Sequence, residues 1–296
     1  MAVTYEFRPT QTPMNLKRFT FFVLVLIFSL FCNFASIAEV NLLALGDHFF
    51  KLENYNAAIT EYKRFLFFHP DDMRAAEVYR KIGLAYRSQG LWQEAILAMR
   101  NAVLHASDEK AKSEYQLELA VILIASQNYD LARLELIKVA IRNSSGTLFR
   151  RALFLQAVAN IYQFRWQEAR EALQNYTADE ILDNLFDHAI NFPRKSTRVA
   201  KVLSAILPGA GQIYAGNWRG GLNALALNGA LGFVTVDSVL DKHYVDAVLW
   251  TYFFFSRYYF GNLHQAGRAV DEFNENTSHR AADSILKRLQ EIVETP

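Results

Sequence analysis

The sequence predicts an all-α protein, in which a solenoid of helix-turn-helix repeats precedes a short transmembrane helical hairpin. Three observations support this fold class. Apolar residues recur at helical spacing along most of the chain, and an internal repeat with a period of 37 residues runs through its first half. Two apolar segments, joined by a short polar turn, follow in the last third.

The composition argues against a nucleic-acid-binding protein and favours one that contacts lipid. The chain has 296 residues, with 31 Lys plus Arg against 30 Asp plus Glu, so it lacks the basic excess that is typical of nucleic-acid binders. Apolar residues make up 52% of the chain and aromatic residues 14%, which is high for a soluble helical protein and indicates that some apolar surface meets lipid. We expect no nucleic-acid partner.

Residues 1–38 are predicted to be a signal peptide or an N-terminal anchor. Lys17 and Arg18 precede an apolar run at 19–34, and small residues follow up to Ala38. A basic end, an apolar middle and a small-x-small ending are the features of an export signal, and cleavage would fall after Ala38. An uncleaved anchor is the alternative, because an apolar run of about 16 residues is close to the length that spans a bilayer.

Residues 39–177 contain four units of the repeat. Large aromatic residues recur at the 37-residue interval: Tyr55, Trp92, Tyr129 and Trp166. Alanines recur at the same interval: Ala58, Ala95, Ala132 and Ala169. The string WQEA occurs at 92–95 and again at 166–169, so four matching units are not a chance coincidence.

Each unit is predicted to be a pair of helices. In the first unit, apolar residues at helical spacing lie on both sides of the turn Glu53-Asn54, and His69-Pro70 ends the pair because proline does not continue a helix. Paired helices need small residues where they approach closely. The small pairs are Gly46 and Ala58, Gly83 and Ala95, Ala120 and Ala132, and Ala157 and Ala169.

Residues 39–177 resemble the tetratricopeptide repeat family. The first unit matches the family pattern at its Leu, Gly, aromatic, Ala and Pro positions, and the second unit is nearly as good a match. The third and fourth units depart from the pattern, because alanine replaces the glycine and the terminal prolines are missing. The resemblance implies a right-handed solenoid with a concave groove that holds a peptide or a partner helix.

The resemblance also implies which residues line the groove, since the first helix of each pair supplies most of the lining. The matching positions are Leu43, Asp47, Phe50, Lys51, Arg80, Leu84, Arg87, Leu117, Val121 and Ile124. Some relatives clamp the C-terminal carboxylate of a partner with a lysine and an asparagine, but Leu43 and Asp47 stand at those positions here. The alternative interpretation is that Arg80 and Arg87 are only solvated charges on one helix face.

After a linker at 178–198, residues 199–265 are predicted to form a membrane module of two or three helices. One apolar segment covers residues 222–236 and extends at most to residue 240, and a second covers 245–260. Each is near the lower limit of length for a bilayer span, and a short polar turn joins them into a hairpin. A buried hairpin in a soluble protein is the alternative.

Residues 199–215 are either a third crossing or an interfacial helix. They are apolar but contain Pro208 and two glycines, which membrane helices tolerate when neighbours satisfy the freed backbone groups. Arg219 and Arg268 flank the hairpin and acidic residues lie near its turn, so the positive-inside rule puts the turn outside the cytoplasm. With exported repeats, this arrangement needs an odd number of crossings before Arg219, which favours a third crossing.

A glycine-rich string at 207–222 opens the membrane module. Gly211 and Gly216 have the spacing of a phosphate-binding loop, but Asn217 and Trp218 stand where that loop needs lysine and serine or threonine. The string resembles a bacterial family of small membrane domains marked by P-G-x-G-Q-x-Y-x-G and a glycine-led apolar helix. The matching residues are Pro208, Gly209, Gly211, Gln212, Tyr214, Gly216 and Gly221.

Residues 198–275 are also similar to the membrane segment of repeat proteins grouped with the membrane-protein insertion efficiency factor. The cysteine-containing core of that factor is missing here. The resemblance implies a bacterial envelope protein and a role in membrane-protein biogenesis. Asn223 and Asn228 lie within the apolar helix, where polar residues usually bond between helices or mark an intramembrane site.

The sequence contains no motif of an active site. It lacks H-E-x-x-H, G-x-S-x-G and cysteine pairs, and its seven His are scattered without ligand spacing. The single cysteine, Cys32, lies in the first apolar run, and Phe31 stands where a lipid-attachment signal needs a small residue. We therefore predict no enzyme activity, no metal, no cofactor and no small-molecule substrate.

The predicted function is that of a non-enzymatic, membrane-anchored scaffold, which binds a protein or peptide partner through the repeat groove and contacts membrane lipid. The alternative is a membrane-protein biogenesis or insertion factor that acts through its hydrophobic module. The export signal predicts the bacterial inner membrane, with the repeats on the periplasmic side. Residues 266–296 alternate charged and apolar positions as an amphipathic tail helix does, in solution or on the membrane surface.

Overall fold

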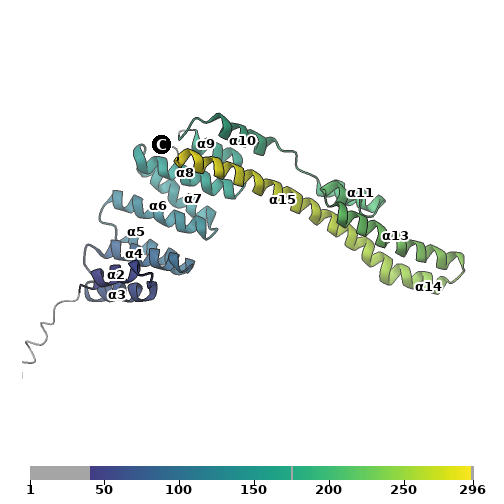
Figure 1. Cartoon of the computed structure of the whole chain (residues 1–296), viewed down its shortest axis with the longest axis horizontal. Coiled ribbons are helices and arrows are strands. Elements are labelled where there is room, and N and C mark those ends of the chain that lie inside the picture. The colour runs from purple at the N-terminus through teal and green to yellow at the C-terminus, as the bar shows by residue number, and fades with distance from the viewer. Residues whose placement is uncertain (1–40, 175, 295–296) are drawn as a thin grey trace, which may run out of the picture. The chain divides into compact units, whose positions relative to one another are not determined.

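The structure, a computed structural model, describes residues 41–174 and 176–294. The regular elements of these residues are all helices, which confirms the all-α prediction for this part of the chain (Figure 1). The chain divides into two compact units between Ser107 and Asp108. The predicted signal or anchor at 1–38, with Cys32, lies outside the described residues.

The first unit consists of two helix-turn-helix pairs. Its helices are α2 (Leu42–Lys51), α3 (Tyr55–Phe68), α4 (Ala75–Ser88) and α5 (Trp92–Leu104). Asn41 and Asn54 cap the first two helices, because each side-chain oxygen accepts a hydrogen bond from a backbone N–H in the first turn. Both turns need left-handed backbone, which Glu53 adopts at φ 58° and Gly90 at φ 73°.

Close helix approach explains the small residues of the first unit. Gly46, Ala58, Gly83 and Ala95 are all buried, as predicted. A Cβ atom at Gly46 would lie 2.6 Å from the Tyr62 ring, and a Cβ atom at Gly83 would lie 3.3 Å from the Ala95 carbonyl oxygen. The repeat pattern therefore marks the contacts at which paired helices meet.

The second unit begins with two more pairs and a further helix. These are α6 (Glu109–Ala125), α7 (Tyr129–Arg142), α8 (Gly146–Tyr162), α9 (Trp166–Leu173) and α10 (Glu180–Asn191). The four alanines predicted at the helix contacts, Ala120, Ala132, Ala157 and Ala169, are fully buried. The 37-residue repeat thus describes the helix pairs of both units.

The rest of the second unit contains the predicted hairpin. Its elements are α11 (Thr197–Ile206), α12 (Ala210–Ala215), α13 (Trp218–Leu240), α14 (Tyr244–Leu249), the π-helix η1 (Trp250–Phe255) and α15 (Ser256–Glu294). Helix α13 packs against α14 and η1 across the turn at 241–243. The second limb has no break, because helical structure continues from α14 through η1 into α15.

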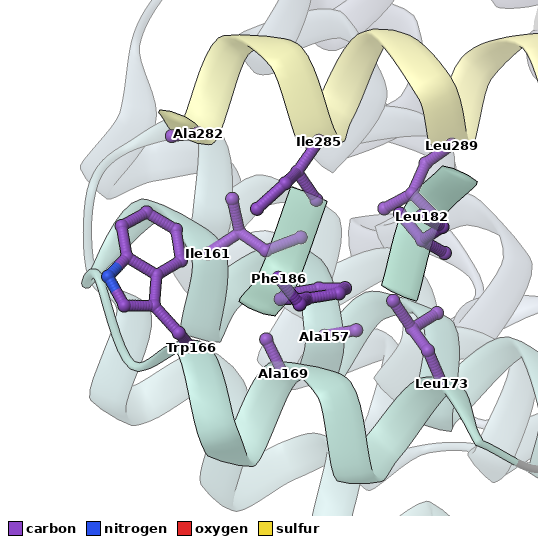
Figure 2. Close-up of a cluster of buried hydrophobic side chains, with 10 residues drawn as sticks. All are labelled: Ala157, Ile161, Trp166, Ala169, Leu173, Leu182, Phe186, Ala282, Ile285 and Leu289. Atoms are coloured by element: carbon purple, nitrogen blue, oxygen red, sulfur yellow. The ribbon is translucent and has the colours of Figure 1, made fainter. Parts of the chain in front are cut away.

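The end of α15 covers the last helices of the repeat array. Ala282, Ile285 and Leu289 are buried against side chains of α8, α9 and α10, among them Trp166 and Phe186 (Figure 2). The amphipathic pattern of the tail is therefore the pattern of a helix that packs on the protein itself. Repeat arrays need such a cap, because each repeat buries its apolar face only against a neighbour.

Candidate functional site

Asp47, a predicted groove residue on α2, is held by its own unit. Its carboxylate accepts hydrogen bonds from Lys81 Nζ at 2.7 Å and from the Tyr62 hydroxyl at 2.7 Å. Partial burial alone would raise the pKa of Asp47, but the hydrogen bonds from Lys81 and Tyr62 outweigh this effect and lower it. Burial and the adjacent Asp47 carboxylate raise the pKa of Tyr62. This link ties the first helix pair to the second.

The other predicted groove residues of the first unit differ in the exposure of their side chains. Leu43 and Phe50 are half-buried against the core of this unit. Arg80 forms an ion pair with Glu77 at 2.9 Å. Lys51 and Arg87 are exposed, whereas Leu84 is half-buried. Lys51 and Arg87 are therefore the charged groove positions most accessible to a partner.

Three predicted groove residues lie in the second unit, on α6. Leu117 is only 1% exposed, so it belongs to the core and contributes no accessible surface. Val121 is 37% exposed and Ile124 is half-buried. Their spacing in the sequence places Leu117, Val121 and Ile124 on one face of α6. Packing of α6 against α7 and α8 nevertheless buries Leu117.

A buried polar cluster between α6 and α7 was not predicted from the sequence. Arg142 Nη1 donates to Gln116 Oε1 at 2.5 Å and to Ser113 Oγ at 3.2 Å, and Asn143 Nδ2 also donates to Ser113. Ser113 and Gln116 are buried, so these bonds satisfy groups that would otherwise destabilise the core. The interspersed polar residues on α6 were the only signal for this cluster.

The glycine-rich string forms the centre of the predicted membrane module. Gln212 Nε2 donates to Asn262 Oδ1 at 2.8 Å, and Gln212 Oε1 accepts from Ser204 Oγ at 3.0 Å. The backbone N–H groups of Gly209 and Gly211 donate to Asn262 Oδ1 and Ser204 Oγ respectively. All three polar side chains are buried, so this network joins α11, α12 and α15 through hydrogen bonds that water does not share.

The glycines of the string allow three backbone segments to meet. A Cβ atom at Gly209 would lie 2.0 Å from the Gly221 carbonyl oxygen, and one at Gly211 would lie 2.1 Å from the Ala200 carbonyl oxygen. Gly209 and Gly216 both have φ 96°, a left-handed conformation that favours glycine, and they bracket α12. Pro208 is half-buried in the turn before α12.

Tyr214 belongs to a second contact between the linker and α15. Its hydroxyl accepts a hydrogen bond from the Ser196 N–H, and the Lys195 ammonium lies 3.6 Å from the centroid of the Phe273 ring. The Asn274 side chain accepts from the Lys195 N–H and donates to the Lys195 carbonyl oxygen. The end of the linker is therefore fastened to the middle of α15.

The two asparagines of α13 have different surroundings. Asn223 is exposed. Asn228 is buried, and its Nδ2 donates to the Ala224 carbonyl oxygen at 2.8 Å. Its Oδ1 has no hydrogen-bond partner within the described chain.

The hairpin presents a large apolar surface. Among the described helices, α13 alone is long and apolar enough to span a bilayer, with a mean hydropathy of 1.3 and only 6% of that stretch buried. Large apolar side chains on the second limb are exposed as well, including Val245, Val248, Tyr252, Phe253 and Phe260. Soluble monomers rarely expose contiguous apolar surface of this extent.

No group of three or more His, Cys, Asp or Glu gathers as metal ligands within residues 41–294, apart from residue 175, which is not described. The sequence likewise lacks the motif H-E-x-x-H and cysteine pairs.

Comparison with known proteins supports the repeat prediction. A tetratricopeptide repeat family model matches residues 43–111 and 80–146, which lie within the predicted array. None of the curated proteins compared with the chain matches it. Tetratricopeptide repeats generally bind protein partners and are generally non-enzymatic, so residues 43–146 are similar to a family of protein-interaction scaffolds.

Proposed function

We propose that the protein is a non-enzymatic scaffold of the bacterial inner membrane, which is anchored by its C-terminal module and binds a protein partner through its repeats. One observation carries the proposal. A single unbroken helical limb runs from the exposed apolar hairpin to the end of the repeat array, where α15 is buried. An apolar anchor and an interaction scaffold are thereby joined in one molecule.

The length of α13 supports one crossing, and the continuous helical limb that packs against it from residue 244 onward supports a return crossing. Helix α13 has 23 residues, which correspond to about 34 Å of helix, close to the thickness of a bilayer core. Helices α11 and α12 have 10 and 6 residues, and neither reaches across a bilayer. The exposed side chains of Val199, Val202 and Ile206 on α11 suit the interfacial alternative for this stretch.

Two connections link the hairpin to the repeats, and both support an even number of crossings. The linker is fastened to α15 by the bonds between Lys195 and Asn274, and α15 itself continues to the repeats. Both ends of the hairpin therefore lie on the side of the membrane that holds the repeats, and the turn at 241–243 lies on the other side.

Two charge signals disagree about which side that is. The N-terminal signal predicts exported repeats, whereas Arg219 and Arg268 at the base of the hairpin would favour a cytoplasmic base under the positive-inside rule. The first apolar segment usually dominates orientation during synthesis, so we give the N-terminal signal precedence. The repeats and the base are then periplasmic, and the turn is cytoplasmic.

Labelling of single cysteines tests this topology. In a Cys32→Ser background, Ser107→Cys, Glu275→Cys and His243→Cys would be labelled from outside intact spheroplasts with a membrane-impermeant maleimide. We expect labelling at residues 107 and 275 and protection at 243 until the cells are permeabilised. Labelling at residue 243 alone would place the repeats in the cytoplasm, and equal labelling at all three would rule out the anchor.

Partner binding is tested with the whole chain, because removing α15 would expose the apolar end of the repeats. Detergent-solubilised protein would be used to capture partners from an envelope extract, with Arg87→Glu and Val121→Asp as groove variants. Arg100→Glu, an exposed position on α5, is the matched control. A partner retained by the control but lost from both groove variants supports the proposal, and a partner unaffected by either groove variant contradicts it.

A role in membrane-protein biogenesis is a second candidate, and the buried network of Ser204, Gln212 and Asn262 favours it. A plain anchor needs no such network, whereas a module that handles other membrane proteins needs a defined shape. Replacing residues 218–255 with an unrelated hydrophobic hairpin, while keeping α15, separates the two roles. Full function of this chimera would eliminate the biogenesis role.

A further inference from the structure

A pocket opens between α13 and α15 in the half of the hairpin that is distant from its turn. Its volume is about 440 Å³, and its lining includes Asn228 and Leu227 on α13 and Arg257, Gly261 and Gln265 on α15. The two helices are kept apart here, since α15 makes most of its contacts with α11 and α12 instead. The pocket is therefore a groove between two candidate membrane helices.

Asn228 leaves an unsatisfied acceptor in the wall of this groove. The residue is 3% exposed, and the bond from its Nδ2 to the Ala224 carbonyl fixes the orientation of the amide, because only the nitrogen can donate. Oδ1 is consequently left without a partner. A buried acceptor of this kind destabilises a protein unless a donor arrives from outside the chain.

Arg257 leaves an unsatisfied cation in the same groove. It forms no ion pair or hydrogen bond within residues 41–174 and 176–294, and it lines the pocket beside Leu227. Leu227 and Asn228 lie near the middle of α13, so a span that uses all of α13 puts Arg257 close to the bilayer centre. A charged side chain at that depth is costly without a counter-ion.

Neither the hairpin nor the groove supplies a carboxylate at the level of this cation. Glu272 also lines the groove, but it is fifteen positions beyond Arg257 on α15, which is about 22 Å along the helix. The acidic residues of the hairpin between 218 and 260 are Asp237, Asp241 and Asp246, and all three lie around the turn. Asp237 is ten positions beyond Leu227 on α13, which is about 15 Å along the helix. In a side-by-side pair of identical hairpins, Arg257 would again meet no acid at its own level, so a second copy is not the occupant.

We propose that this groove binds a transmembrane helix of another protein, which carries an aspartate or glutamate level with Arg257. The inference rests on the membrane anchoring proposed above. The polar head of a lipid stays near the membrane surface, whereas a helix brings a carboxylate to the depth of Arg257 and a hydrogen-bond donor to that of Asn228. The occupant is thus defined by its apolar length and one central acid.

The spacing of small residues suits a third helix. Gly220, Ala224 and Asn228 are four residues apart on α13, so they share one face. On α15, Gly261 and Ala269 share one face with Gln265 between them, so each helix lines the groove with two small residues and one amide. Small residues at this interval let the backbones of membrane helices approach closely, which strengthens packing and hydrogen bonds between them.

Synthetic helices of known sequence test the proposal. The whole chain, labelled with a donor dye at His243→Cys in a Cys32→Ser background, would be reconstituted into phosphatidylcholine vesicles. Acceptor-labelled Leu-Ala peptides of about 20 residues would carry a central Asp, a central Leu or an Asp displaced by two turns. We expect the central Asp peptide to associate about fivefold or more tightly than the other two, measured by energy transfer.

Two groove variants and one control test whether the preference for the central Asp peptide depends on the groove. Arg257→Gln should remove the advantage of the Asp peptide, while Arg268→Gln, an exposed arginine on α15 outside the groove, should keep it. Gly261→Leu fills the groove and should weaken association of every peptide. Equal association of the Asp and Leu peptides with the unaltered chain overturns the proposal.

The remaining outcomes separate failure of the groove from failure of the anchor. Protein that is extracted from the vesicles by alkaline carbonate is not inserted, and this result overturns both the anchor and the groove. Inserted protein without Asp preference overturns the groove alone. Arg257-dependent enrichment of phosphatidylglycerol in mixed vesicles, without Asp preference, identifies a lipid site and also overturns the helix proposal.

Discussion

At the scale of single residues, Asn262 is the side chain on which the packing of α11, α12 and α15 depends most. Its Oδ1 accepts from the Gly209 N–H at 3.1 Å and from Gln212 Nε2 at 2.8 Å, and its Nδ2 donates to the Ser204 carbonyl oxygen at 3.2 Å. One amide therefore satisfies polar groups from α11, α12 and the turn between them. It lies outside the glycine-rich string, so the motif alone did not reveal it.

Asn262→Leu should destabilise the module by about 1–3 kcal/mol for each buried group left without a partner. The leucine is similar in size to asparagine, but it can neither accept from Gln212 nor donate to Ser204. Thermal unfolding of the detergent-solubilised chain measures the effect. Asn223→Leu is the control, because this amide is exposed on α13. Equal melting temperatures for the two variants would contradict the importance of the network.

Gly211 tests how closely the backbones approach. A Cβ atom there would lie 2.1 Å from the Ala200 carbonyl oxygen and 2.6 Å from Ser204 Oγ, so Gly211→Ala must separate α11 from α12. We expect a loss of about 1–3 kcal/mol, as for other overpacked sites. Gly229→Ala on α13 meets open space and should be neutral or stabilising by up to about 1 kcal/mol. Chemical unfolding of both variants in the same detergent compares them.

At the scale of elements, the contact of α15 with the repeats is apolar and specific. Leu289 is 1% exposed and Ile285 is fully buried among residues of α8, α9 and α10. Leu289→Ala should destabilise this contact by about 2–5 kcal/mol, because the cavity adds to the lost burial. Hydrogen exchange in α9 and α10 should accelerate accordingly. Val293→Ala, at an exposed position on the same helix, should change exchange little.

An ion pair holds the same contact in a pH-dependent way. Arg288 Nη2 donates to Asp179 Oδ2 at 2.6 Å, and this bond, together with one from the Leu182 N–H, lowers the pKa of Asp179. A carboxyl with a lowered pKa stabilises the folded state above its ordinary pKa of about 3.9, and the contribution is lost as the pH falls through the lowered value.

We therefore expect the contact between the end of α15 and the repeats to weaken in acid. The protection of backbone amides at the end of α15, taken relative to the intrinsic exchange rate at each pH, should fall as the pH falls below about 4. Asp179→Asn should show the lower protection already at neutral pH and a smaller further change in acid. Glu180→Gln is a matched control, because it removes a neighbouring exposed carboxylate that has no such bond to Arg288. The same acid response in Asp179→Asn as in the unaltered chain would rule this ion pair out as its cause.

Local features could be predicted from the sequence, whereas contacts between distant segments could not. The helix pairs were predictable because Gly46, Ala58 and their equivalents recur at one interval, and because turns and caps depend on neighbouring residues. The tail was recognised as amphipathic, but its pattern does not name the surface that it covers. That surface lies more than 100 positions earlier, at Ile161 and Trp166. The burial of Leu117 likewise depends on packing that spacing does not describe.

At the scale of the whole molecule, the second unit joins its helical repeats to an apolar hairpin by two parallel connections. One is the linker, which contacts α15 through Lys195, and the other is α15, which meets the linker at Asn274 before it reaches the repeats. A helix fixed at both ends transmits rotation and translation, unlike a flexible tether. The position of the hairpin is therefore coupled to the packing of α8, α9 and α10.

Insertions into α15 test this coupling. One alanine inserted after Asn276, between the linker contact and Ile285, rotates the two buried faces of the helix by about 100° relative to each other. It should therefore release Ile285 and Leu289 from the repeats, which hydrogen exchange in α10 would detect. Seven alanines restore the rotation to within about 20° but lengthen the helix by about 10 Å. Without a second change, the seven-alanine variant should remain impaired, because the short segment between α10 and α11 cannot lengthen by the same distance.

Lengthening both connections should rescue the contact. Seven alanines after Asn276, combined with a flexible insertion of similar reach between Phe192 and Pro193, keep the helix face in register and allow the two halves to separate. Protection of α10 should then return to that of the unaltered chain, while the single insertion stays unprotected. If one alanine and seven alanines perturbed exchange equally, even with the longer linker, then α15 would act as a loose tether, because only a continuous helix distinguishes insertions by their rotation.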